Sequence, residues 1–324
     1  MSPPELSILI VSYNTCPLTL TCLDSVYTET HDLSFEVIVV DNASADGSAK
    51  EIRERFPSVI LHESPTNLGF AAANNLAARL ARGRHLLLLN PDTVVLDGAV
   101  QKLHRFALAR PEAGIVGGRT FFEDGSLNPT SCRGRPTPWS LLCRGLGLST
   151  LFPGSLLFDS ESLGPWQRDS VREVDIVTGC LLLISRALWE ELGGFDPAFF
   201  MYGEESDLCL RARARGFRPM ITPEARIIHL GGASEPVRAD KMVRLLGALV
   251  LLVRRHWSAR SAPFGVAMLW LWAATRAIGA RVLPRALVHR NESVAAWHLV
   301  FARRAEWLHP AAAMPLRPRE PASD

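Results

Sequence analysis

Short apolar runs alternate with helical patterns along the first part of the chain. The runs that we expect to form strands cover residues 6–11, 35–40, 59–61 and 85–89. The helical patterns between and after them cover residues 18–27, 48–56, 71–80 and 97–109. Strands that alternate with helices in this order indicate βαβ units and a parallel sheet flanked by helices. In the second helix, Ser48 to Glu51 fit the pattern of a capping box.

The second part of the chain continues the pattern less regularly. Further strands are expected at residues 115–116, 180–184 and 217–221, and further helices at residues 186–192, 205–215, 239–255 and 264–282. Residues 119–172 are rich in Gly, Pro and Ser and contain no motif that we can interpret. Residues 310–324, rich in Pro and Ala, are expected to fray.

Composition places the chain among ordinary globular proteins. It has 324 residues, 48% hydrophobic and 21% charged, which excludes a disordered protein. The six cysteines form no Cys-x-x-Cys pair, which favours reduced core thiols of a cytoplasmic protein over disulfides or a zinc site. Residues 1–5 lack a basic region followed by an apolar stretch, so we expect no signal peptide. The uncharged residues 261–275 are fewer than the ~20 that a membrane span needs.

The charges are distributed unevenly, although the net charge is only +2. Residues 235–324 hold 14 Lys and Arg against 6 Asp and Glu, a charge of +8, and the rest of the chain carries −6. Five of the eight tryptophans also lie in this basic tail. Basic charge interleaved with tryptophan suits an anionic membrane surface. The alternative is a helical subdomain with a solvated basic face. We expect no nucleic-acid partner.

Polar residues follow three of the predicted strands. Ser12-Tyr13-Asn14, Asp41-Asn42 and Asn90-Pro91-Asp92-Thr93 each stand where an apolar run ends. Ligand-binding groups of α/β folds lie just past the carboxyl ends of strands, where a carboxylate can hold a divalent cation against a diphosphate. Downstream, residues 202–207 supply a carboxylate cluster, and residues 229–234 supply a lone histidine. One such motif alone is usually a turn, but turns do not explain all of them in this order.

Together these motifs resemble the family 2 glycosyltransferases of the GT-A fold, in particular their rhamnosyltransferase-like branch. The matching segments are residues 10–14, 41–48 (DNASADGS), 67–75 (NLGFAAANN), 90–93, 177–211 and 229–234 (HLGGAS). The resemblance covers about residues 5–235 and implies a Rossmann-like mixed sheet flanked by helices. It divides the chain into a catalytic domain, residues 1–235, and a helical, basic, membrane-associating region, residues 236–324.

The resemblance implies an inverting transfer of a sugar from a nucleoside diphosphate sugar. The branch favours dTDP-L-rhamnose as donor, with a UDP-sugar as the alternative. The acceptor would be a glycan or a lipid-linked glycan in cell-surface polysaccharide synthesis. The expected location is cytoplasmic and peripheral, on the inner face of the cytoplasmic membrane. The sequence does not determine the acceptor, the linkage or the oligomeric state.

The resemblance also assigns residues to the nucleotide. Asp41 would accept the ring N–H of the base, although a helix N-cap is an alternative role for this residue. The other nucleotide-side residues would be Ser12, Asn14, Asn67, Gly69, Asn75 and Asn90. Gly69 would let the backbone approach closely, or would simply form a turn.

The resemblance likewise assigns a metal and a base. Asn90 replaces the first residue of the family's Asp-x-Asp motif, which leaves Asp92 as the strong anionic ligand for Mn²⁺ or Mg²⁺. His229 would be a second ligand, or else a structural histidine. Glu205 matches the general base, and Glu204 remains an alternative because relatives often have Glu-Asp here. Asp207 would contact the acceptor or brace the start of the helix.

Three other functions were weighed against this one. A dinucleotide-dependent enzyme would need a G-x-G-x-x-G motif after a strand, and none is present. A sugar-1-phosphate nucleotidyltransferase would need a Gly-rich triphosphate loop after the first strand, where Ser12 to Thr15 offer none. A non-catalytic protein that binds only a nucleotide sugar or a membrane is disfavoured by the joint presence of Asp92, Glu205 and His229.

Overall fold

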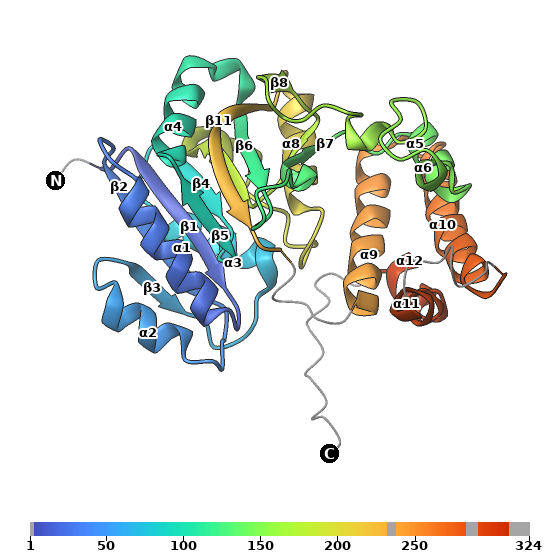
Figure 1. The fold of residues 1–324 in the computed structure, drawn as a ribbon, viewed down its shortest axis with the longest axis horizontal. Coiled ribbons are helices and arrows are strands. Elements are labelled where there is room, and N and C mark those ends of the chain that lie inside the picture. The colour runs from blue at the N-terminus through green and yellow to red at the C-terminus, as the bar shows by residue number, and fades with distance from the viewer. Residues whose placement is uncertain (1–2, 232–237, 283–290, 311–324) are drawn as a thin grey trace.

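The computed structural model describes residues 3–231, 238–282 and 291–310 (Figure 1). Its centre is a nine-stranded sheet in the order β3-β2-β1-β4-β10-β6-β11-β5, with β8 paired to β11. The predicted parallel strands form one half of it, as β1 (Leu6–Ser12), β2 (Phe35–Asp41), β3 (Ile60–Glu63) and β4 (His85–Leu89). Their carboxyl ends therefore lie at one edge of the sheet, as the sequence predicts.

The other half of the sheet is mixed. Its strands are β5 (Thr93–Leu96), β6 (Ile115–Phe121), β8 (Arg172–Glu173), β10 (Leu181–Ser185) and β11 (Met220–His229). β10 runs antiparallel to both β4 and β6, whereas β11 is parallel to β6 and antiparallel to β5 and β8. A separate two-stranded sheet joins β7 (Cys132–Arg133) to β9 (Ile176–Val177). The expected mixed sheet is confirmed.

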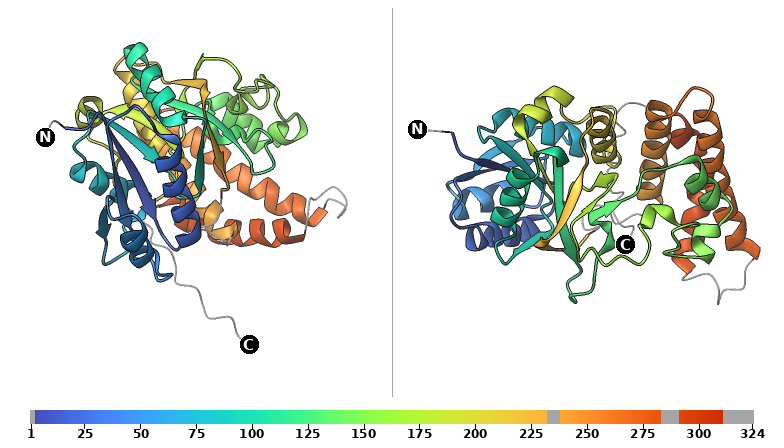
Figure 2. Two further views of the ribbon diagram at one scale, coloured as in Figure 1. Left: turned by 60° about the vertical axis from the view of Figure 1, so that its left-hand side comes forward. Right: turned by 90° about the horizontal axis from the view of Figure 1, so that it is seen from above.

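Helices cover both faces of the sheet (Figure 2). The helices on these two faces are α1 (Cys16–Glu29), α2 (Ser48–Arg55), α3 (Gly69–Leu80), α4 (Ala99–Ala109), α7 (Arg186–Leu192) and α8 (Glu204–Ala214). Alternate residues of β1 explain this arrangement, because Ile8 and Ile10 pack with residues of α1 and α4, whereas Leu9 packs with residues of α3 and α8. Three short 3₁₀ helices occupy connections, at Pro111–Ala113, Pro129–Ser131 and Ser160–Ser162.

A second group of helices stands beside the sheet (Figures 1 and 2). It contains α5 (Pro138–Gly145), α6 (Leu148–Leu151), α9 (Arg238–His256), α10 (Ala262–Val282), α11 (Asn291–Ala302) and α12 (Arg304–Leu308). Their shared core includes Leu141 of α5 and the fully buried Trp307. Trp272 and Trp297 contact each other there, with ring centroids 5.3 Å apart. Most tail tryptophans thus pack this cluster, and Trp270 is 41% exposed.

Several local predictions were wrong, each for a physical reason. The capping box does not form, because α2 begins at Ser48 after the left-handed Gly47, and Asp46 accepts the Ser48 amide. The last strand does not end at residue 221, because β11 continues past Pro223 through an irregularity in its pairing with β6. The strand β5 and the helix α5 were also not predicted.

Two further predictions concern redox state and membrane spans. All six cysteines are free and buried, at the core positions expected for them. Within the described ranges, no helix is both long and apolar enough to cross a bilayer. The expected fraying concerns residues 310–324, of which 311–324 lie outside the described residues, as do residues 232–234 of the HLGGAS segment.

Candidate functional site

A cavity of about 700 Å³ opens where the strands end. Its lining comes from the ends of β1, β2, β4 and β11, from the start of α8, and from α9 of the helical group. The predicted site residues among its lining are Asn67, Gly69, Asn90, Asp92, Glu204, Glu205 and His229. These residues span more than 160 positions of the sequence, so the cavity exists only in the folded chain.

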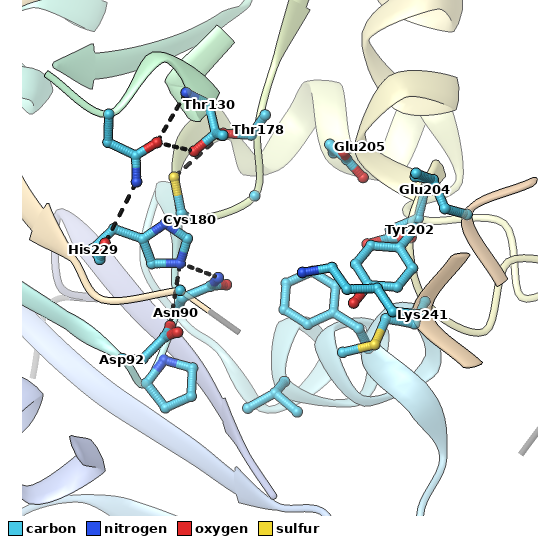
Figure 3. Close-up of a pocket in the computed structure, with 18 of the residues that line it drawn as sticks. Asn90, Asp92, Thr130, Thr178, Cys180, Tyr202, Glu204, Glu205, His229 and Lys241 are labelled. Atoms are coloured by element: carbon cyan, nitrogen blue, oxygen red, sulfur yellow. Dashed lines mark hydrogen bonds and ion pairs between the residues drawn. The ribbon is translucent and has the colours of Figure 1, made fainter. Parts of the chain in front are cut away.

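Asn90, Asp92 and His229 lie together on one side of the cavity (Figure 3). His229 Nε2 is 3.3 Å from Asp92 Oδ1 and 3.3 Å from Asn90 Nδ2. The backbone enforces this contact, because β5 and β11 pair antiparallel and the amide of Leu230 donates to the Asp92 carbonyl at 3.0 Å. The two candidate metal ligands of the sequence are therefore neighbours in space.

This side of the cavity also contains polar atoms without partners. Within the described residues, Asn90 Oδ1 and His229 Nδ1 are buried and accept or donate no hydrogen bond. Asp92 is only 6% exposed. Because a buried polar group without a partner is costly, such atoms favour a ligand that completes their bonding.

The acidic pair stands on the other side, at the first turn of α8 (Figure 3). Gly203, with φ of +86°, forms the N-cap, so the helix starts sharply and directs Glu204 and Glu205 toward the cavity. Burial and the neighbouring Glu205 raise the pKa of the Glu204 carboxyl well above its ordinary value. Glu205 Oε1 lies 3.5 Å from Arg133 Nη2. The pair thus has two distinct members, a buried acid and a carboxylate beside a guanidinium.

Asp207 faces away from this cavity. Its carboxylate accepts from Arg211 Nε at 2.7 Å and contacts His256 Nε2 of α9 at 2.8 Å. It is 1% exposed. Of the two roles expected for Asp207, these contacts fit bracing of the helix rather than contact with an acceptor.

Asn67 and Gly69 form a compact turn with Asn42 on the floor of the cavity. Asn67 Oδ1 accepts from Asn42 Nδ2 and from the Gly69 amide, both at 2.9 Å. Gly69 has a φ of +79°, and a Cβ there would clash with the carbonyl oxygen of Phe200. Gly69 therefore permits a close approach of the backbone at Phe200 rather than of a ligand. The amide of Phe70 donates to the Phe200 carbonyl at 2.8 Å.

The remaining nucleotide-side residues do not line this cavity. Ser12 is fully buried and contacts Thr19 Oγ1 at 3.0 Å. Asn14 Oδ1 accepts from the Ala45 amide, and the side-chain amide of Asn75 pairs with both backbone groups of Phe195.

Asp41 stands apart from these three residues. Its Oδ2 accepts from the Ser44 amide at 3.1 Å, whereas its Oδ1 is buried and has no partner among the described residues. The carboxylate therefore keeps one acceptor atom that the fold itself does not use. Its position at the end of β2, next to the cavity residue Asn42, is the one that the sequence predicts.

Several residues of the cavity were not predicted from the sequence. Lys241 and Leu245 of α9 line it, although the predicted catalytic domain ends at residue 235. The Lys241 ammonium points into the cavity, 5.9 Å from the centre of the Tyr202 ring (Figure 3). Arg133 was missed as well. Asn42 was noted beside Asp41 at a strand end but was given no role, whereas no local signal marks a lysine in a later helix.

The arrangement of Asp92 and His229 can be compared with the needs of a metal ion. Across the described residues, no group of three or more His, Cys, Asp or Glu side chains could hold a metal alone. Neighbouring ligands of an octahedral Mg²⁺ or similar ion lie about 3 Å apart. The separation of 3.3 Å between Asp92 Oδ1 and His229 Nε2 matches this, so the pair fits a cation whose other ligands come from a substrate.

Comparison with known proteins gives the family. The profile of Glycosyl transferase family 2 matches residues 7–171. The O-antigen biosynthesis protein RfbC of Myxococcus xanthus is 29% identical over 246 residues, which are 73% of this chain and 18% of that protein. The N-acetylglucosaminyl-diphospho-decaprenol L-rhamnosyltransferase of Mycobacterium tuberculosis is 30% identical over 211 residues, 60% of this chain and 66% of that protein. The chain therefore spans less than two thirds of either relative.

Solved structures show the same fold. The mannosyltransferase PcManGT from Pyrobaculum calidifontis, in complex with GDP-Man and Mn²⁺, has a TM-score of 0.58 at 20% identity and covers 95% of this chain and 88% of its own. Residues 1–349 of TarS from S. aureus have a TM-score of 0.52 at 13% identity, and the match covers 94% of this chain and 81% of that one. Because the family profile matches just over half of it, the chain belongs to glycosyl transferase family 2, and its fold is the GT-A fold of these structures.

Proposed function

We propose that this glycosyltransferase moves a sugar, with inversion, from a nucleoside diphosphate sugar to a lipid-linked glycan in cell-surface polysaccharide synthesis. The observation that carries the proposal is the cavity itself, with Asp92 and His229 on one side and the Glu204–Glu205 pair on the other. A donor needs charge compensation at its diphosphate, and an acceptor needs a base. Asp92 and His229 offer ligands for a cation that would compensate the diphosphate, and the acidic pair offers a carboxylate for the base.

The donor diphosphate would lie at the side of Asp92 and His229. These two residues would hold Mn²⁺ or Mg²⁺, which supplies positive charge to the departing diphosphate when it is bound. Asn90 Oδ1, which has no partner among the described residues, would take part in binding the cation or the donor beside Asp92 and His229. Lys241 points its ammonium into the cavity toward this side and would add a second positive charge. PcManGT, which is similar in fold, was solved with GDP-Man and Mn²⁺.

The nucleoside would lie along the turn of Asn42, Asn67 and Gly69. A uracil or thymine ring that enters beside Asn42 carries a ring N–H that could donate to Asp41 Oδ1, which has no partner among the described residues. Ser12, Asn14 and Asn75 would support this subsite through their hydrogen bonds to neighbouring segments.

Glu205 would act as the base. In the displacement, the acceptor hydroxyl oxygen forms a bond to the anomeric carbon while the bond from that carbon to the diphosphate oxygen breaks, and the proton passes to Glu205. Arg133, 3.5 Å away, keeps this carboxylate in place. Burial and the neighbouring Glu205 raise the pKa of Glu204 and so favour its protonated form, which leaves Glu205 as the preferred base.

The similarity to the mycobacterial N-acetylglucosaminyl-diphospho-decaprenol L-rhamnosyltransferase favours L-rhamnose as the sugar and a lipid diphosphate as the acceptor. The favoured donor is therefore dTDP-L-rhamnose, and a UDP-sugar is the alternative. A lipid acceptor would place the enzyme peripherally at the inner face of the cytoplasmic membrane.

A panel of sugar nucleotides in a thermal-shift assay with Mn²⁺ tests this proposal. A bound donor should raise the melting temperature, since saturation at about 100 times Kd adds ~2.7 kcal/mol to stability. The same donor should fail to stabilise Asp92→Ala, which should melt like the wild type without ligand. Stabilisation by no nucleotide sugar, or equal stabilisation of the variant, would contradict the donor assignment.

A further inference from the structure

Exposed apolar side chains gather on α5, on α6 and on the segment that follows them. Six of them are Trp139, Leu146, Leu151, Phe152, Leu156 and Leu157. Leu151 is 70% exposed and Leu156 is 66% exposed. From residue 136 to residue 158, Arg144 is the one charged residue. Soluble monomers rarely expose so many large apolar side chains together, so this surface calls for a partner.

Contacts within this segment make it one unit, which we call the apolar lobe (residues 138–158). Trp139 Nε1 donates to the Leu157 carbonyl at 2.7 Å, which joins the two ends of the lobe. The ring centroids of Phe152 and Phe158 are 5.1 Å apart. The exposed leucines therefore project from a folded lobe.

Helix α10 extends the surface and contributes positive charge. Thr275 Oγ1 donates to the Gly145 carbonyl at 3.2 Å, and Arg276 contacts Thr150 of the lobe. Ile278, two residues further, is 60% exposed. The sequence of α10 has two arginines, at positions 276 and 281, and no acidic residue. Apolar side chains beside Arg276 suit an anionic lipid surface, and the carboxylate of Asp159 at the end of the lobe is bound to the Gly154 amide at 2.9 Å.

The lobe also adjoins the active-site cavity. Glu161, which lines the cavity, accepts from Ser140 Oγ at 2.8 Å and from Arg144 Nη2 at 2.7 Å, both in α5. Ser162 and Arg168 line the cavity as well. If the sugar of a lipid-linked acceptor enters the cavity, its lipid would therefore emerge beside the apolar side chains of the lobe.

We propose that the apolar lobe docks the enzyme on an anionic bilayer, with Leu151, Phe152, Leu156 and Leu157 entering the acyl boundary. The biological purpose of this docking rests on the proposed lipid-linked acceptor, but the docking does not. A second copy of the chain is a poorer occupant, because a symmetric contact would bring the same arginines close to one another. The earlier prediction placed membrane contact in residues 236–324, whereas here the inserting residues come from the middle of the chain.

Flotation of the full-length protein with phosphatidylcholine vesicles containing phosphatidylglycerol tests the docking. The double variant Leu151→Ser with Leu156→Ser should bind at least about tenfold more weakly, since it removes apolar groups that would enter the bilayer. Leu108→Ser is the matched control, because Leu108 is 58% exposed on α4 of the catalytic layer. It should bind like the wild type.

Two further measurements make the outcome decisive. Hydrolysis of the donor in solution should be equal in the wild type and the double variant, because neither leucine lines the cavity. Vesicle binding without any sugar transfer would overturn the proposed function and leave the docking intact. The docking would be overturned by unchanged flotation of the double variant, by an equal loss in Leu108→Ser, or by leucine-dependent self-association without vesicle binding.

Discussion

Replacing Glu205 by glutamine tests the base directly. We expect Glu205→Gln to lower kcat by about 10²–10⁴-fold, because the amide cannot take the proton of the acceptor hydroxyl. In the barrier this is about 2.7–5.5 kcal/mol. The KM for the donor should change little, since Glu205 lies across the cavity from Asp92 and His229 (Figure 3). A loss confined to kcat is the signature of a base, whereas damage to the whole cavity would also raise KM.

The structure provides a matched control for this change in the adjacent residue. Glu204 is buried, and its raised pKa favours the protonated carboxyl, which resembles the amide of glutamine. Glu204→Gln should therefore keep turnover within about threefold of the wild type, well below the effect of losing a base. The local fold should survive either change, because Arg133 remains bound to Ser206 Oγ at 2.6 Å.

Single-turnover transfer from a labelled donor, with melting temperatures recorded for each variant, measures both effects. The reasoning is refuted if Glu204→Gln loses turnover while Glu205→Gln keeps it, in which case the two roles are exchanged. It is also refuted if Glu205→Gln retains near wild-type kcat with Glu204 intact.

Three further predictions concern charge, packing and pH. Lys241→Met should raise the KM for the donor about tenfold, the equivalent of ~1.4 kcal/mol, whereas Lys50→Met on the exposed side of α2 should not; steady-state kinetics decide this. Gly69→Ala should lower the free energy of unfolding, measured in urea, by about 2–5 kcal/mol, because the added Cβ clashes with Phe200 and the backbone is left-handed. Gly47→Ala has open space around it and should lose only the energy of a left-handed backbone at a non-glycine residue. Because the pKa of Glu204 is raised in the folded state, its contribution to the free energy of unfolding is complete below pH 4.5, its ordinary pKa. This contribution is lost as the pH rises through the pKa of the folded state. Glu204→Gln should therefore become more stable relative to the wild type over that pH range.

The strand-end chemistry could be predicted because it follows from local pattern. Apolar runs gave the strands, and parallel pairing brought their ends to one edge. Asn90 and Asp92 therefore reach the cavity as predicted. His229 reaches it because the unpredicted strand β5 pairs with β11. The sequence supplied the residues, but the pairing that brings His229 to Asp92 was not visible in it.

Other features could not be predicted because they depend on distant contacts. Asn75 satisfies the backbone of Phe195, which is 120 positions away, so its place in a family motif does not reveal its structural role. α5 lies in a segment rich in Gly and Pro, and its apolar face is explained only by packing against α10. The short strand β5 directly follows a turn and is stabilised by its pairing with β11. Periodicity along the chain records none of these partners.

The helical region after residue 235 is tied into the active site rather than appended to it. Asp207 of α8 contacts His256 of α9, and Arg255 of the same helix pairs with Asp196 before the acidic pair. Phe199 and Leu252 share a further apolar cluster between the two parts. The boundary at residue 235 remains a prediction. A chain that ended there would lose Lys241 from the cavity and the contact of His256 with Asp207, so the helix that carries the acidic pair would lose its packing against α9.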